Sequence, residues 1–118
     1  MPNPKTCFGR LLRRCAKHVT KFRLSAQAAR DLRRISATGR RDHGVAASER
    51  HLAGFERLFQ LLREQPFAGQ ERPEFARRVR SLSHRPHRIL YRLEGDTVLI
   101  VRILHHAQDA PRALRGEQ

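Results

Sequence analysis

The side chains that could do chemistry in this sequence are mainly histidines and arginines between positions 79 and 106. His84 and His87 flank a predicted loop and could bind a metal ion together with a third residue, but histidines in such loops are more often solvated. His105 and His106 are adjacent at a predicted strand end, where neighbouring side chains point to opposite faces. That pair would form a poor joint metal site, so we expect no bound metal.

The sequence lacks the common motifs of catalytic and cofactor sites. It has no glycine-rich phosphate loop, no HExxH motif, and no serine in a Gly-x-Ser-x-Gly context. Cys7 and Cys15 both lie near the N-terminus, so we expect no disulfide framework and predict a reducing, cytoplasmic location. No apolar run approaches the roughly 20 residues of a membrane helix. We therefore expect no cofactor and no membrane partner.

The charge of the chain is strongly positive, with 25 basic and 11 acidic residues and a formal net charge of +14. Such a charge indicates an acidic or polyanionic partner, either nucleic acid or an acidic protein segment. Five of the basic residues and none of the acidic ones precede Val19. We expect residues 1–18 to be a disordered basic extension; the alternative is an arm that contacts nucleic acid.

A meander of three strands should position these side chains. Residues 97–104 (TVLIVRIL) form a short, β-branched run that predicts a strand buried on both faces near the sheet centre. Residues 88–94 alternate, which predicts one drier and one wetter face, and Gly95 supplies the turn between the two strands. A third strand is expected over residues 77–82, followed by a loop at residues 83–87 around Pro86.

The first half of the chain predicts an edge strand over residues 19–24 and two helices. Ser25 is the expected N-cap of the first helix, which Gly39 should weaken or end early. Residues 45–65 carry a clear apolar stripe and predict the second helix, which Pro66 ends. Residues 67–76 should form a loop, and the tail from residue 107 a loop or frayed helix. The resulting order is β-α-α-β-β-β, an α+β two-layer sandwich with a helical hairpin on a small, mainly antiparallel sheet.

At this point the sequence resembles the RelE/ParE superfamily of toxins from bacterial type II toxin–antitoxin systems. The resemblance extends from Lys21 to Asp109 and rests on the order of several short motifs. These are FRLSAQAARDL, QPFAG after the second helix, RVRSL with Arg80 and Ser81, RILYRL, and VLIVRILHHAQD with Leu104, His105 and Asp109. The last block favours the ParE-like branch. Residues 19–109 would then be the toxin domain, with residues 110–118 a C-terminal tail.

This resemblance implies a plasmid-stabilisation toxin that poisons DNA gyrase and is neutralised by a ParD-like antitoxin. The binding residues would be Arg80, Arg88, Arg92, Arg102, His105 and Asp109. Arg80, Arg102 and Asp109 could instead form a structural ion pair at the sheet end.

Two alternatives stay open. A RelE-like mRNA endonuclease acting in the ribosome would need cations for the phosphorane charge and an acid–base group, which Arg80, Arg88, Arg102 and His105 could supply. However, no tyrosine follows His106, whereas many nucleases of the superfamily carry one there. A non-toxic basic nucleic-acid-binding domain is weaker, because no helix combines basic and base-reading residues on one face.

Overall fold

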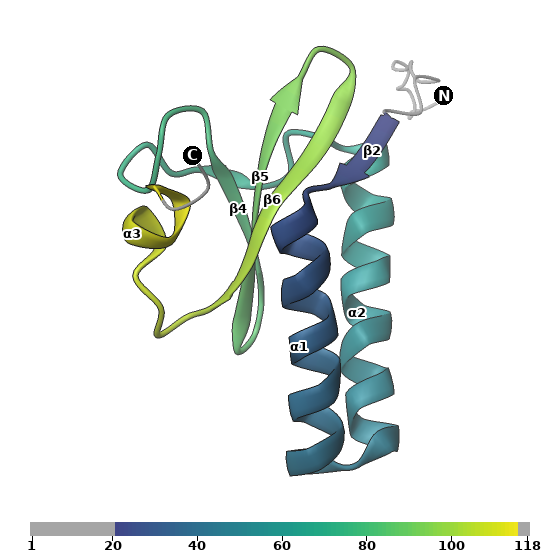
Figure 1. Ribbon diagram of the computed structural model, residues 1–118. Helices are drawn as coiled ribbons and strands as arrows, with labels where there is room; N and C mark the ends of the chain where they lie inside the picture. Colours follow the sequence, from purple (N-terminus) through teal and green to yellow (C-terminus); the bar gives the residue numbers. More distant parts are fainter. Residues whose placement is uncertain (1–20, 116–118) are drawn as a thin grey trace, which may run out of the picture.

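The computed structural model describes residues 21–115, so the extension predicted for residues 1–18 lies outside the described residues. The described chain forms five strands and three helices. In order they are β2 (Lys21–Leu24), α1 (Ala26–His43), α2 (Val45–Glu64), β3 (Gln70–Glu71), β4 (Arg80–His84), β5 (His87–Glu94), β6 (Thr97–His105) and α3 (Ala110–Arg115) (Figure 1). No helix in the described part is long and apolar enough to cross a membrane.

The five strands form one mixed sheet in the order β2-β6-β5-β4-β3. The edge strand β2 runs parallel to β6, whereas the β6-β5, β5-β4 and β4-β3 pairs are antiparallel. The predictions of an edge strand before the helices and of a β4-β5-β6 meander are therefore confirmed. The parallel pair is a non-local contact, since Phe22 lies opposite Val98.

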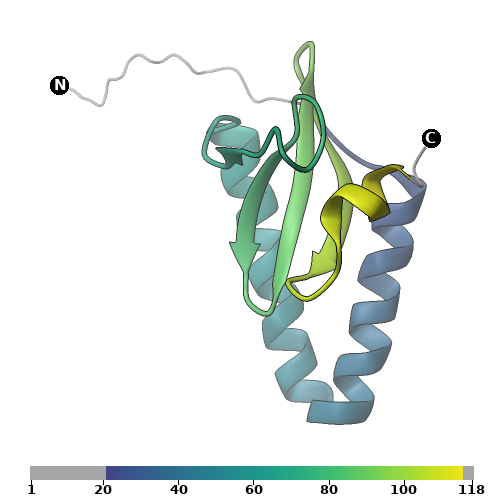
Figure 2. The same ribbon diagram turned by 90° about the vertical axis from the view of Figure 1, so that its left-hand side faces the viewer.

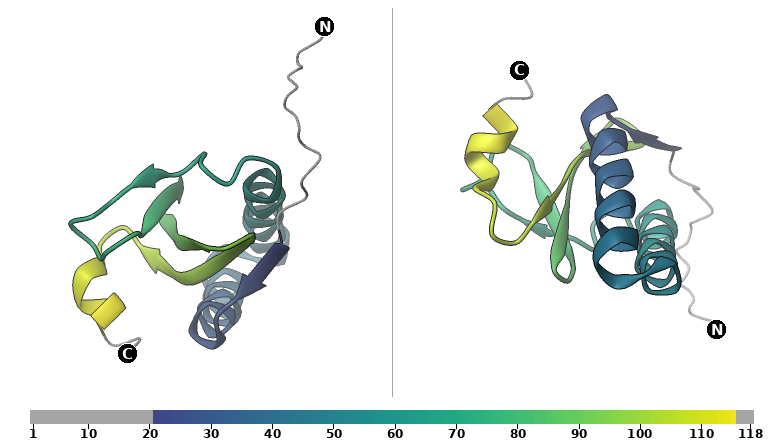
Figure 3. Two further views of the ribbon diagram at one scale, coloured as in Figure 1. Left: turned by 90° about the horizontal axis from the view of Figure 1, so that it is seen from above. Right: turned by 60° about the horizontal axis from the view of Figure 1, so that its bottom comes forward.

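The helical hairpin covers one face of the sheet, and α3 lies against part of the other face (Figures 2 and 3). This arrangement confirms the predicted α+β architecture with a hairpin on a small sheet. The view from above shows α1 and α2 on one side of the strands and α3 on the opposite side (Figure 3). Ala110 and Leu114 bury α3 against Leu90, Val101 and Leu104 of the sheet.

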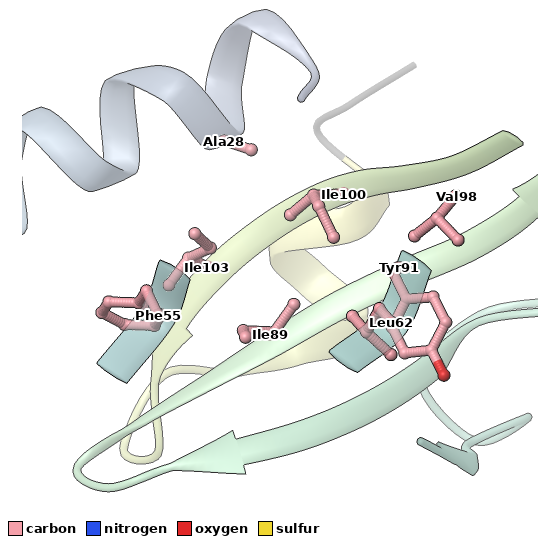
Figure 4. Packing of buried hydrophobic residues seen from close by; sticks show 8 residues of the cluster. All are labelled: Ala28, Phe55, Leu62, Ile89, Tyr91, Val98, Ile100 and Ile103. Carbon is pink, nitrogen blue, oxygen red and sulfur yellow. The ribbon is translucent and has the colours of Figure 1, made fainter. Parts of the chain in front are cut away.

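The main core lies between the hairpin and the sheet (Figure 4). Its fully or nearly fully buried members are Ala28, Phe55, Leu62, Ile89, Tyr91, Val98, Ile100 and Ile103. A register shift between β5 and β6 pairs Leu90 with Arg102 but Tyr91 with Ile100. The extra residue in β6 shifts the alternation of its side chains, so that Ile100 and Ile103 both face the helices and Val101 faces α3. Strand β6 is thus buried on both faces, as its composition predicted.

Ser25 joins the start of α1 to the sheet. Its Oγ accepts a hydrogen bond of 2.9 Å from the Ala28 amide, which confirms the predicted N-cap. The same hydroxyl donates a 2.7 Å hydrogen bond to the carbonyl of Val101 in β6. One side chain therefore fixes both the first turn of α1 and the distance of that turn from the sheet.

The structure differs from the sequence prediction at several boundaries. Helix α1 passes through Gly39 and ends at His43, because Gly39 lies against α2: a Cβ there would come within 3.0 Å of the Ser48 Oγ. Strand β4 begins at Arg80 rather than at residue 77, since Arg78 has a positive φ of 64° that interrupts an extended chain. The predicted loop at residues 67–76 contains the short strand β3, and only Arg85 and Pro86 form the turn between β4 and β5.

Candidate functional site

A hollow of about 520 Å³ lies in the corner between the helical hairpin and the β4–β5 turn. The hairpin extends beyond the strands at this end of the molecule (Figure 1). The lining residues are Asp31, Arg34, Ile35, Thr38, Gly39, Asp42, His43, Ala47, Ser48, His51, Pro86, His87, Ile103, His105 and Gln108. The walls therefore combine apolar side chains with histidines and one exposed arginine.

One wall of the hollow is a buried ion pair between α1 and β6. The Nε and Nη2 atoms of Arg102 donate hydrogen bonds of 2.8 and 3.0 Å to the two carboxylate oxygens of Asp31. The Ile103 amide donates a third, of 3.0 Å, to the same carboxylate. Both side chains are largely buried, at 13% and 5% exposed. This bidentate geometry fixes the orientation of the Arg102 guanidinium, and the positive charge of Arg102 is paired with the Asp31 carboxylate inside the fold.

Four histidines line or adjoin the opposite wall, and we call them the histidine cluster: His51, His84, His87 and His105. His51 of α2 stacks on His84 of β4 with ring centroids 4.3 Å apart. The rings of His51 and His87 are 5.1 Å apart, and that of His105 lies edge-on to His87 at 5.5 Å. His84 and His87 are thus partly buried strand ends beneath α2, not the solvated loop residues that the sequence suggested.

Two rings of the cluster, those of His51 and His87, have a lowered pKa. Burial lowers the pKa of His87 from its ordinary value to about 4, and the nearby His51 contributes further. Burial also lowers the pKa of His51, with a smaller contribution from His84. Within residues 21–115, no group of three or more histidine, cysteine or acidic side chains is placed to hold a metal ion. The cluster is therefore a packed contact between α2 and three strand ends.

Arg80 lies at the other end of β4, away from the hollow. Its Nη1 donates a 2.7 Å hydrogen bond to the carbonyl of Gly69, and its guanidinium stacks over the exposed ring of Phe67 at 4.9 Å. Arg80 pairs with Tyr91 in the sheet, whereas His105 pairs with His87, four residues away on β5. At about 3.3 Å per residue, the two backbone positions are about 13 Å apart along the strand.

Arg88 and Arg92 lie on the face of β5 opposite Ile89 and Tyr91. Arg88 Nη2 donates a 3.0 Å hydrogen bond to His106 Nδ1, and the Arg88 guanidinium lies 5.1 Å from the centre of the Phe75 ring. Arg92 pairs with Glu94 at 3.1 Å on the same face. The cations predicted from sequence are therefore divided between two faces and two ends of the sheet.

Asp109 takes a local role at the start of α3. Its carboxylate accepts a 3.2 Å hydrogen bond from the Arg112 amide, and its carbonyl accepts one of 3.0 Å from the Ala113 amide. Within the described part of the chain, the ion pair considered for Arg80, Arg102 and Asp109 does not form. Instead, Arg80 lies 3.7 Å from Glu71, and Arg102 pairs with Asp31.

Sequence reasoning did not single out Asp31 or His51 as site residues. A signal for Asp31 was present, because it lies three residues after Ala28 and four before Ile35 and so shares their apolar helix face. An acidic residue on a buried face needs a cationic partner. The position of His51 carried no comparable signal, since its ring contacts with His84 and His87 depend on two strands that follow it in the chain.

Comparison with known proteins agrees with this geometry. The family described as "ParE toxin of type II toxin-antitoxin system, parDE" matches residues 22–110. Toxin ParE3 of Caulobacter vibrioides is 34% identical over 74 residues, which cover 63% of this chain and 74% of that protein.

Two solved structures share the fold. One, of the chromosomal ParDE TA system from P. aeruginosa, superposes with a TM-score of 0.66 at 22% identity, covering 75% of this chain and 97% of the other. The other, the toxin–antitoxin complex RelBE2 from Mycobacterium tuberculosis, has a TM-score of 0.54 at 26% identity, covering 73% and 96%. Because the family match covers nearly all of the described fold, the chain belongs to the ParE family of type II toxin–antitoxin toxins.

Proposed function

We propose that this toxin poisons DNA gyrase without catalysing a reaction and that a ParD-like antitoxin neutralises it. Membership of the ParE family supports a toxin with a cognate partner. The proposal for the target rests on what the described residues offer chemically. A poison needs a complementary surface, whereas a ribonuclease needs several groups within reach of one phosphate.

The separation of Arg80, Arg102 and His105 is the observation that carries this proposal. Arg80 and His105 are about 13 Å apart along β5, since Arg80 lies opposite Tyr91 near the middle of that strand and His105 lies opposite His87 at its start. The Arg102 guanidinium is engaged by Asp31 at 2.8 and 3.0 Å. These three residues therefore do not form one site where a phosphorane could be stabilised while a proton is transferred.

The chain's single tyrosine is also unsuited to acid–base chemistry. The Tyr91 side chain is fully buried, and its hydroxyl donates a 2.8 Å hydrogen bond to the Pro66 carbonyl. The same hydroxyl accepts a 2.8 Å hydrogen bond from the Gly69 amide. Tyr91 thus fastens the loop after α2 to β5 and has no access to a substrate.

A RelE-like ribonuclease is the alternative function, and one specific observation favours it. Arg88, Arg92 and His106 share the outer face of the sheet, and the fold superposes on the toxin–antitoxin complex RelBE2. His106 Nδ1 already accepts a hydrogen bond from Arg88, so this pair would have to separate before His106 could take a proton at that atom. Cleavage of ribosome-bound mRNA would be its direct signature.

We place the antitoxin contact at the hollow beside α1. Ile35, Ala47 and Ile103 provide apolar wall there, while Arg34 and His43 provide exposed cationic or protonatable side chains. Together with the net charge of +14, this surface fits an amphipathic acidic segment that folds on binding. Asp31 and Asp42 do not oppose such a partner strongly, because Arg102 and Arg41 lie against them.

The test of the proposed function uses toxin released from its antitoxin and purified DNA gyrase. A non-catalytic poison should inhibit supercoiling in proportion to its molar ratio to gyrase and should accumulate gyrase-linked DNA breaks. Adding the antitoxin back should reverse the inhibition. Unchanged supercoiling at a large molar excess of active toxin, together with cleavage of mRNA on purified ribosomes, would replace this proposal by the ribonuclease alternative.

A further inference from the structure

The histidine cluster connects α2 to the ends of three successive strands. His51 comes from α2, His84 ends β4, His87 begins β5 and His105 ends β6. These four are a majority of the seven histidines in the chain, so more than half of its histidines meet at one corner of the fold. If α2 separated from the sheet, the contacts of His51 with His84 and His87 would be lost together.

The rings are tightly enclosed by α2. Gly54, which directly precedes Phe55 in α2, lies so close to His84 that a Cβ there would be 2.3 Å from the ring carbon Cε1. Phe55 meets the His84 ring edge-on at 4.6 Å and the His51 ring at 5.0 Å. The His84 side chain extends from the end of β4, and its ring packs directly against α2. The ring therefore cannot turn toward solvent unless α2 moves away.

Hydrogen bonds indicate which ring nitrogens of the cluster carry a proton. His84 Nε2 lies 2.8 Å from the His51 carbonyl, which can only accept, so this nitrogen carries a proton. His51 Nε2 and His87 Nδ1 are 3.0 Å apart, so one nitrogen donates and the other accepts. If both rings were fully protonated, two N–H groups and two positive charges would face each other across this distance.

The surroundings do not offset such charges. His87 faces His51 from α2, His84 from β4, and His105 and His106 from β6. The charged groups around the hollow and the β4–β5 turn are Asp31, Arg34, Asp42, His43, Arg85 and Arg88. The two carboxylates in this set are already engaged, Asp31 by Arg102 at 2.8 Å and Asp42 by Arg41 at 3.5 Å. Protons added to the cluster therefore meet mainly positive neighbours.

We propose that the histidine cluster is a proton-sensitive latch, which holds α2 on the sheet while the His51 and His87 rings are neutral and releases it when these two rings are protonated. The inference does not depend on the target of the toxin. Opening the latch would also reshape the hollow, because His51, His87 and His105 are part of its wall.

The direction of the pH effect follows from the lowered pKa of the His51 and His87 rings. Burial lowers the pKa of His87 to about 4 and lowers that of His51, compared with about 6.5 for an exposed histidine. The open form therefore binds protons more readily than the closed form. The contribution of the latch is complete above about pH 6.5 and is lost as the pH falls from there toward 4.

The test is hydrogen exchange of α2 backbone amides in the full chain, corrected for the intrinsic effect of pH on exchange. Between about pH 7 and pH 5 the opening constant of α2 should rise roughly tenfold, after allowing for partial solvent screening of the rings. His51→Gln together with His87→Gln should remove most of this pH dependence. His43→Gln, at an exposed histidine at the end of α1, is the matched control and should retain it.

A second measurement keeps the test decisive if the double variant folds poorly. In the wild-type chain, histidine ring NMR signals should show the His51 and His87 rings titrating below about 6.5, in step with the loss of α2 protection. The proposal is overturned if α2 protection does not change over this pH range. It is also overturned if the folded double variant keeps the full pH dependence of the wild-type chain.

Discussion

Asp31 and Arg102 lie 71 positions apart in the chain and are joined by two hydrogen bonds of 2.8 and 3.0 Å. The pair connects the middle of α1 to the bulged part of β6, where the strand no longer has β2 beside it, since β2 pairs only as far as Ile100. It thereby closes the side of the core that the edge strand leaves uncovered. The Arg102 guanidinium thus has a structural contact within the fold.

Replacing Asp31 should destabilise the fold strongly. Asp31→Ala leaves the Arg102 guanidinium without its carboxylate and the Ile103 amide without its acceptor, so we expect a loss of about 3–5 kcal/mol in the free energy of unfolding. Urea denaturation of the antitoxin-free chain measures this loss. Asp42→Ala is the control, because Asp42 is half exposed and its pair with Arg41 should contribute no more than about 1 kcal/mol.

The double variant Asp31→Leu with Arg102→Met separates charge pairing from packing. Removing both charges should recover much of the stability lost in Asp31→Ala, because no uncompensated charge stays buried. The single variants Asp31→Leu and Arg102→Met complete the cycle. If the double variant lost as much stability as the sum of these two, the ion pair would not be the reason for their effect.

The Tyr91 hydroxyl gives a spectroscopic prediction. Burial raises the pKa of this phenol, and the chain has no other tyrosine and no tryptophan to obscure its absorbance. In alkaline titration the folded chain should therefore ionise above about pH 10, whereas the chain unfolded in denaturant should ionise near that value. Identical titration curves for the folded and unfolded chain would show that the hydroxyl is accessible to water.

Tyr91→Phe tests the same contact by stability. The variant keeps the ring but leaves the Gly69 amide and Pro66 carbonyl without their partner, which should cost about 1–3 kcal/mol. Thermal unfolding of the variant measures this cost, and a change below about 0.5 kcal/mol would mean that water replaces the hydroxyl without penalty.

A charge added to the wall of the hollow should weaken antitoxin binding. Thr38 lines the hollow, and Thr38→Glu would place a negative charge where we expect an acidic, amphipathic segment. We predict a loss of at least about tenfold in affinity, equivalent to about 1.4 kcal/mol, measured by calorimetry with the cognate antitoxin. Ala37→Glu adds the same charge at the neighbouring exposed position of α1 and should bind within about twofold of the wild type. Equal effects of the two variants would argue for long-range charge alone and against contact at the hollow.

Deleting residues 1–18 tests the predicted domain boundary. The two apolar clusters of the described chain are formed between residues 22 and 114, so we expect the melting temperature and antitoxin affinity to change little. A drop of several degrees in the melting temperature would show that Phe8, Leu11 and Leu12 pack on the domain.

The elements with strong local signals could be predicted from sequence. The β-branched run in β6 indicated burial on both faces, and the structure divides its residues between the two clusters on either side of the sheet. Ser25 was recognised as a cap because its type and place before an apolar helix repeat are local properties. Gly39 misled the prediction, since its low helix propensity is outweighed by the close approach of α1 to Ser48 of α2.

The candidate site was less predictable, because its contacts join distant parts of the chain. The arginines chosen for their charge point to different faces, and the direction of Arg102 depends on the register shift opposite Leu90 and Tyr91. The histidine cluster was missed for the same reason: His51 and His87 are 36 positions apart and meet only when α2 packs on the sheet. Sequence patterns indicate which face of an element is buried, but not which polar groups meet across it.

The most direct test of the account is to induce the toxin in a sensitive host without antitoxin and to follow DNA and mRNA over the first minutes. We predict DNA breaks and an SOS response first, with ribosome-bound messages intact, and only a modest change in toxicity for His105→Ala. Co-expressed antitoxin is the control and should prevent the DNA damage. Rapid cleavage of mRNA at codon-defined positions, with intact DNA and loss of cleavage in His105→Ala by roughly 10²–10⁴-fold, would contradict the gyrase proposal.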